Sequence, residues 1–155
     1  MSFSDDLDRQ RAQIMRAVRR ASDGWAEAMR AHKLAPPDAG FSERLRSLAA
    51  AAATEQVAWE NAHGAGLLWR PVPGAENAAP PYELRPGTGR RGPPAMWERF
   101  DAAVTRLNHA ITGSSAADVA DAFGEFAEAT EQLADAVARE DEAAQPSRAR
   151  TRGAA

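Results

Sequence analysis

The sequence predicts an all-α protein, a four-helix bundle-like arrangement of two antiparallel helical hairpins joined by a long Pro/Gly-rich loop. Four segments place apolar residues at spacings of three and four, and short turns connect these segments in pairs. Between the pairs, residues 64–94 hold seven of the ten prolines, a density that forbids regular helix. We expect one helical domain over residues 1–142, because 155 residues with 44% hydrophobic content can bury a single core.

The first helix is predicted over residues 5–33. Ser4 is a good N-cap, and Asp5 and Asp6 fall in the first turn, where the helix dipole favours negative charge. One face follows a heptad rhythm, which indicates packing against another helix. This face consists of Leu7, Arg11, Ile14, Val18, Ala21, Trp25, Ala28 and His32.

The second helix is predicted over residues 41–62, after Pro36 and Pro37 end the first. Its alanine run has the highest intrinsic helix propensity of the chain, and small residues let a neighbouring helix approach closely. The shared face is Phe41, Leu45, Leu48, Ala52 and Trp59. The loop over 64–94 is long for a compact domain, which indicates a segment that is either functional or mobile.

The third helix is predicted over residues 95–111 and the fourth over 116–141. Ser115 is the expected N-cap of the fourth, and the short turn before it makes the two helices an antiparallel hairpin. After this hairpin we expect a disordered basic tail over residues 143–155. A competing layout has the two hairpins docking on another subunit instead of on each other, because strict heptads favour coiled-coil packing.

Composition excludes several classes of protein. The absence of cysteine excludes disulfides, thiolate nucleophiles and zinc–thiolate sites. No apolar run approaches the length of a membrane span, and the N-terminus lacks the apolar stretch of a secretory signal. Eighteen arginines against a single lysine are typical of a high-GC, actinobacterial-like genome. We therefore expect a bacterial, cytoplasmic protein.

The residues that could carry catalysis are few. Only His32, His63 and His109 are histidines, and Glu60 with His63 forms one Glu-x-x-His spacing where a di-metal bundle needs two. No Gly-x-Ser-x-Gly sequence occurs, and the glycines of 86–92 lack the Gly-Lys-Ser/Thr ending of a phosphate loop. We predict no catalytic residue, no metal and no cofactor. A metal-dependent helical-bundle enzyme is kept as the second alternative.

Charge is unevenly distributed along the chain. Residues 95–145 hold eleven acidic and three basic side chains, whereas residues 1–35 hold seven basic and five acidic ones. The acidic last helix is expected either to face solvent or to dock on the arginine-rich first helix, within the chain or across a dimer. A DNA-associated regulator is the first alternative, because arginines of the first helix and the tail can neutralise phosphates. Its residues would be Arg16, Arg19, Arg20, Arg148, Arg150 and Arg152.

These observations favour a non-enzymatic helical interaction protein, an adaptor, regulator or assembly component that acts through protein–protein contacts. Heptad faces and charge asymmetry also predict self-association into a homo-oligomer, with nucleic acid as a less favoured partner and no membrane contact. Exposed aromatics and arginines make effective contact anchors. The predicted partner-binding residues are therefore Trp69, Tyr82, Arg90 and Arg91 of the long loop.

Overall fold

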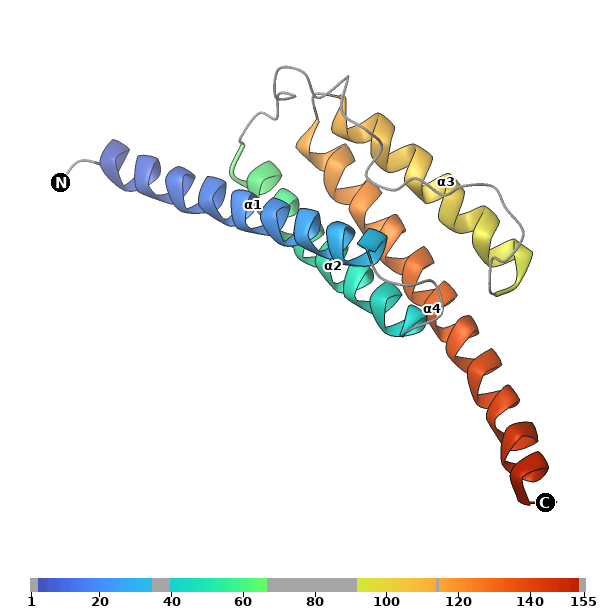
Figure 1. The fold of residues 1–155 in the computed structure, drawn as a ribbon. Helices are drawn as coiled ribbons and strands as arrows, with labels where there is room; N and C mark the ends of the chain where they lie inside the picture. The colour runs from blue at the N-terminus through green and yellow to red at the C-terminus, as the bar shows by residue number, and fades with distance from the viewer. Residues whose placement is uncertain (1–2, 35–39, 67–91, 114, 154–155) are drawn as a thin grey trace.

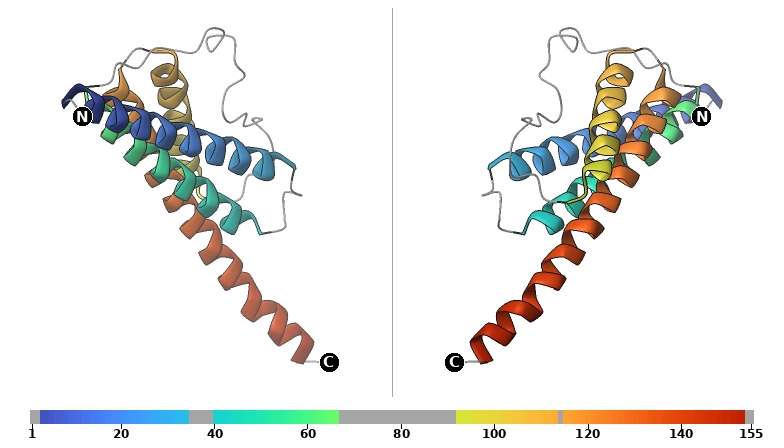
Figure 2. Two further views of the ribbon diagram at one scale, coloured as in Figure 1. Left: turned by 90° about the vertical axis from the view of Figure 1, so that its left-hand side faces the viewer. Right: turned by 90° about the vertical axis from the view of Figure 1, so that its right-hand side faces the viewer.

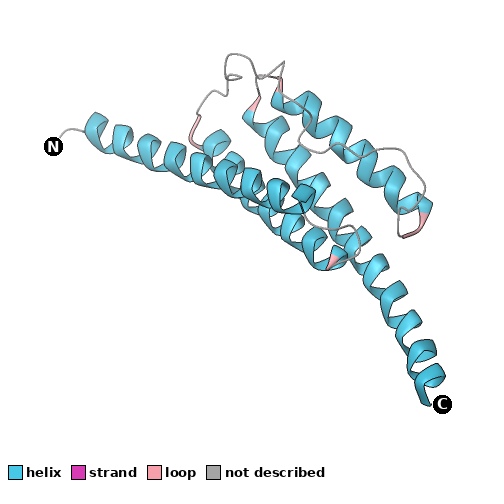
Figure 3. Ribbon diagram, viewed as in Figure 1, coloured by secondary structure: helices cyan, strands magenta, loops and turns pink. Residues whose placement is uncertain are grey.

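The structure, a computed structural model, describes the backbone of residues 3–34, 40–66, 92–113 and 115–153, and the side chains of 4–32, 40–66, 92–113 and 115–143. This part of the chain forms four helices and no strand (Figures 1 and 3). They are α1 (Phe3–Leu34), α2 (Phe41–Gly64), α3 (Pro94–Ile111) and α4 (Ala116–Gly153). The predicted all-α class is confirmed.

The helix ends follow the local signals in the sequence. Gly40 precedes α2 with φ 59°, a left-handed conformation that glycine adopts without steric cost. Pro94 occupies the first turn of α3, where its missing N–H has no intrahelical partner to lose. The Oγ of Ser115 accepts a hydrogen bond from the N–H of Asp118 at 3.2 Å, which caps α4 as predicted.

The helices pack in the order α1, α2, α4, α3. α1 and α2 form one antiparallel hairpin, α3 and α4 form the other, and α2 with α4 makes the most extensive contact (Figure 2). The two hairpins therefore dock on each other through α2 and α4, and the competing layout with hairpins docked only on another subunit is wrong. At the α2–α4 contact, Gly124 leaves room for Gln56, since a Cβ at position 124 would lie 2.7 Å from the Gln56 Nε2.

Aromatic rings from three helices meet at the centre. The Trp25 ring of α1 lies edge-on to Phe123 and Phe126 of α4, with ring centroids 5.4 and 5.1 Å apart. Phe100 of α3 contacts the same Phe126 at 5.3 Å. Because Phe100 and Phe126 are fully buried, this cluster joins both hairpins into one core.

The first half of α1 departs from the predicted face. Val18, Ala21 and Trp25 are buried as expected, whereas Leu7 is 38% exposed and Arg11 is exposed. The N-terminal end of α1 extends past the end of α2 (Figure 1), so no described residue covers these positions.

The end of α4 also differs from the prediction, which had a helix to 141 and a disordered tail from 143. In the structure α4 continues to Gly153 and projects away from the other helices (Figure 1). Alanine and arginine make up most of residues 143–153 and are among the best helix formers, so a polar, basic composition does not prevent helix, and Pro146 removes one backbone hydrogen bond without ending α4. Within the described part of the chain, no helix combines the length and apolar character that a bilayer crossing requires.

The acidic side chains of α4 are exposed, as one of the two expectations had it, and their docking on arginine-rich α1 within the chain is wrong, whereas docking across a dimer stays a prediction. The carboxylates of Asp135 and Glu125 instead form ion pairs with Arg46 of α2 and Arg106 of α3, at 3.3 and 2.9 Å. α4 packs mainly on α2 and α3, so its carboxylates meet the arginines of those two helices.

Candidate functional site

The four predicted partner-binding residues lie outside the described residues. Trp69, Tyr82, Arg90 and Arg91 all belong to the segment 67–91, so the prediction for them stays a prediction. The candidate site must therefore be sought on the four helices.

The arginines of the DNA-binding alternative divide into two groups. Arg16, Arg19 and Arg20 are exposed on α1, and no described residue forms an ion pair with them. The backbone of Arg148, Arg150 and Arg152 lies in the last turns of α4, but their side chains are outside the described set. The structure thus brings together only the first three, within two turns of one helix.

The histidines of the metal alternative are spread over the protein. His32 lies beside Phe41 at the start of α2, with ring centroids 6.0 Å apart, while His63 is exposed at the other end of that helix. Burial and the charge of Arg44 lower the pKa of His32 to about 4. His109 is exposed near the end of α3. Among the described residues, no three His, Asp or Glu side chains come close enough together to hold a metal ion.

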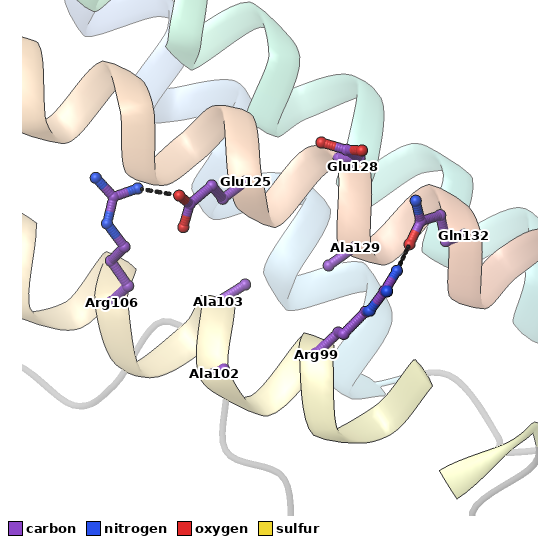
Figure 4. Close-up of a pocket in the computed structure, with 8 residues that line it drawn as sticks. All are labelled: Arg99, Ala102, Ala103, Arg106, Glu125, Glu128, Ala129 and Gln132. Carbon is purple, nitrogen blue, oxygen red and sulfur yellow. Dashed lines mark hydrogen bonds and ion pairs between the residues drawn. The ribbon is translucent and has the colours of Figure 1, made fainter. Parts of the chain in front are cut away.

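A groove of about 410 Å³ follows the seam between α3 and α4 (Figure 4). Its two arginines both reach across the seam: Arg99 donates a hydrogen bond to Gln132 at 3.1 Å, and Arg106 pairs with Glu125. Alanines make the floor between them. Both guanidinium groups bind residues of α4, and Glu125 and Glu128 line the same groove, so its lining carries both signs of charge.

One carboxyl group is buried between α1 and α2. Glu55 is only 2% exposed and accepts a hydrogen bond from the Trp59 Nε1 at 2.9 Å, and Ser22 of α1 is a second hydrogen-bonding partner. Burial raises the pKa of Glu55 to about 7, against the opposing influence of the two hydrogen bonds. Because Ser22 belongs to α1 and Glu55 to α2, this carboxyl group links the two helices.

A second groove, of about 450 Å³, lies between α1 and α2. Its lining is uncharged and mostly apolar, and consists of Ala17, Ala53, Thr54, Val57, Ala58 and Asn61. Val57 is 56% exposed, the most exposed of the large apolar side chains in the described part. Val57 therefore projects from the helix without a described neighbour to cover it.

The exposed side of α2 next to this groove carries few charges. Between Arg46 and Glu60 the only charged residue is Glu55, and it is buried. The exposed residues in this interval are Ser47, Ala50, Ala53, Thr54 and Val57. We call the exposed residues of α2 from Ser47 to Asn61, with Ala17 of α1, the α2 outer face.

Sequence analysis missed this face, although a signal for it was present. The stripe of Leu45, Leu48, Ala52 and Trp59 correctly predicted the inner side of α2. The signal for the outer side is the absence of exposed charged residues along α2. The chain has none from residue 47 to residue 59, an interval of about three and a half turns.

No protein-family model matches this chain, and no curated protein and no solved structure is significantly similar to it.

Proposed function

We propose that this chain is a non-enzymatic helical interaction protein, an adaptor, regulator or assembly component that binds a partner helix on the α2 outer face. The single observation that carries the proposal is the groove between α1 and α2, with Val57 exposed beside it. An uncharged groove between two packed helices has a form that the side-chain ridge of a further helix can fill. The bacterial, cytoplasmic setting belongs to the same proposal and rests on composition alone.

The shape and chemistry of the face favour a helix as the bound element. Alanines at positions 50 and 53 allow close approach of a second backbone, and Val57 supplies one larger side chain to insert between its residues. The groove between two packed helices has the form into which the ridge of a third helix fits. An extended peptide would need a sheet edge or several backbone hydrogen bonds, and helices α1 and α2 keep theirs internal.

The experiment is a capture of partners from the host lysate with three baits: the wild-type chain, Val57→Glu, and the triple variant Arg16→Ala, Arg19→Ala, Arg20→Ala. Each capture is repeated with nuclease and at raised salt. We expect the wild-type and triple-alanine baits to retain the same protein, with or without nuclease, and Val57→Glu to lose it. Identical captures with wild type and Val57→Glu would contradict the proposal.

DNA association is the second candidate, and one observation favours it. The three exposed guanidinium groups of Arg16, Arg19 and Arg20 have no described carboxylate partner, so they are available to phosphates. Under this candidate the triple-alanine bait, and not Val57→Glu, loses the captured material. The loss would be reproduced by nuclease and by salt, because phosphate contacts weaken steeply as salt rises.

A further inference from the structure

We propose that the exposed arginines of α1 bind the acidic outer side of α4 in a second copy of this chain. The contact uses neither the groove between α1 and α2 nor Val57, so it goes beyond the proposed docking function. Two features of the molecule support it: the charge of each helix face and the direction in which each face points.

The middle of α1 carries one sign of charge. Residues 9–22 hold five arginines and no acidic residue. Arg16, Arg19 and Arg20 are exposed and form no ion pair with a described residue. Asp23 lies one turn after Arg19, but no ion pair joins it to a described residue either. We call Arg16, Arg19 and Arg20 the α1 arginine surface, and its positive charge exceeds the negative charge beside it.

α4 carries the opposite charge. Residues 117–138 hold six acidic residues, all of them exposed, and no basic one. Arginines of the neighbouring helices compensate two of the six, because Asp135 pairs with Arg46 and Glu125 with Arg106. Three others form no ion pair within the described part of the chain and make up what we call the α4 acidic surface: Asp121, Glu128 and Glu131.

The two surfaces point in opposite directions. At about 100° per residue, Arg16 lies about 180° around α1 from Trp25, and Glu128 lies about 200° around α4 from Phe126. Trp25 and Phe126 contact each other in the core, with ring centroids 5.1 Å apart. Each charged surface therefore lies on the side of its helix that faces away from the other helix, and the two surfaces cannot meet within one chain.

A second copy supplies the missing counterpart. The hairpin with α1 is nearer the viewer in the left panel of Figure 2 and the hairpin with α4 in the right panel, so one copy can use both surfaces at once. Duplex DNA also fits an arginine surface, but it leaves the acidic surface without a counterpart, whereas every copy of the chain offers one surface of each sign.

The contact joins two different surfaces, which determines how it grows. After two copies bind, one arginine surface and one acidic surface are still free, so further copies add head to tail unless the assembly closes into a ring. Because all the side chains involved are exposed, each ion pair is weak and screened by salt. The Debye length falls from about 30 Å at about 0.01 M salt to about 8 Å at physiological ionic strength. We therefore expect association at low salt that weakens at least several-fold at physiological salt.

Sedimentation velocity of nuclease-treated protein at low salt tests the contact with two variants. The first removes the α1 arginine surface (Arg16→Ala, Arg19→Ala, Arg20→Ala), and the second removes the charges of the α4 acidic surface (Asp121→Asn, Glu128→Gln, Glu131→Gln). We expect the mass of the wild type to grow with protein concentration and to return to the monomer as salt is added. Each variant alone should stay monomeric. An equal mixture of the two should form a heterodimer that grows no further, because only one surface of each sign then finds a counterpart.

The matched control is Glu27→Gln, Glu43→Gln, Glu98→Gln. It removes the same number of exposed carboxylates as the second variant, from α1, α2 and α3, and changes the net charge equally. We expect it to associate like the wild type. Circular dichroism of every variant checks that its helix content is unchanged.

Four outcomes would overturn the inference. They are a wild type that is monomeric at every concentration, a mixture of the two variants that does not associate, a variant that associates alone like the wild type, and a control that loses association. If the wild type binds an added DNA duplex through Arg16, Arg19 and Arg20 but never binds itself, the occupant is nucleic acid and the self-contact is wrong. The docking function is tested separately, because Val57→Glu leaves both charged surfaces intact.

Discussion

Replacing Glu55 by glutamine should remove a stability cost that the wild-type protein carries at neutral and alkaline pH. The carboxyl group is 2% exposed, and burial raises its pKa from 4.5 to about 7. The glutamine side chain keeps an oxygen able to accept the hydrogen bond from the Trp59 Nε1, while never taking up a charge. Glu55→Gln therefore mimics the protonated acid at every pH.

The sign of the effect follows from proton binding. Between pH 4.5 and about 7 the folded protein holds a proton on Glu55 that the unfolded chain has released. The contribution of Glu55 to the free energy of unfolding is thus largest below pH 4.5, decreases as the pH rises from there to about 7, and is constant above that pH. At about 1.4 kcal/mol for each pKa unit, the cost in the wild type is about 3 kcal/mol at about pH 8.

The assay is urea denaturation of the wild type and Glu55→Gln from about pH 4.5 to about pH 8, followed by circular dichroism. We expect the two proteins to be similarly stable at the acid end, and the variant to be more stable by about 3 kcal/mol at the alkaline end. Glu60→Gln, which replaces an exposed glutamate of the same helix, controls for the loss of one negative charge. A stability difference between wild type and Glu55→Gln that does not change with pH would refute the reasoning.

Three further predictions concern packing and backbone geometry, each measured as the free energy of unfolding. Gly24→Ala should stabilise the protein by about 1 kcal/mol, because nothing lies within 4 Å of the added Cβ and alanine favours helix. Gly92→Ala should destabilise it by roughly 1–2 kcal/mol, since Gly92 has φ 108° and the new Cβ would lie 3.1 Å from the Leu133 Cδ1. Phe126→Ala should cost about 3–5 kcal/mol, because the ring is fully buried against Trp25. The opposite sign for either glycine variant, or a loss under about 1 kcal/mol for Phe126→Ala, would contradict the packing described.

The sequence predicted the fold well where its signals are local or periodic. Apolar residues at spacings of three and four located the helices, the alanine run supported the second of them, and the Ser115 cap located the start of α4. The end of α4 was missed because a polar, basic composition predicts a disordered tail, although the alanines and arginines of residues 143–153 also favour helix. Periodicity says where a residue points on its own helix but not which helix lies opposite, so the partners of the α4 carboxylates could not be derived.

The candidate site was harder to predict for a related reason. Exposed positions of a helix are recognised by their charges, and the outer side of α2 carries none between Arg46 and Glu60. In its sequence, an alanine-rich helix therefore resembles a wholly buried one. Only the packing of α1 and α4 against α2 shows that the side of α2 with Val57 is uncovered. The loop anchors Trp69 and Tyr82 stay a prediction from composition, because their segment lies outside the described residues.

The central claim is that the α2 outer face is covered by a protein in the working state of this chain. The most direct measurement is the reaction rate of a single thiol with a maleimide, for Val57→Cys and for Ala102→Cys as the exposed control on α3. Both rates are measured for the purified chain when dilute and in the host lysate. The account predicts that the thiol at position 57 reacts several-fold more slowly in the lysate, while the control does not change. Equal rates at position 57 under both conditions would contradict it.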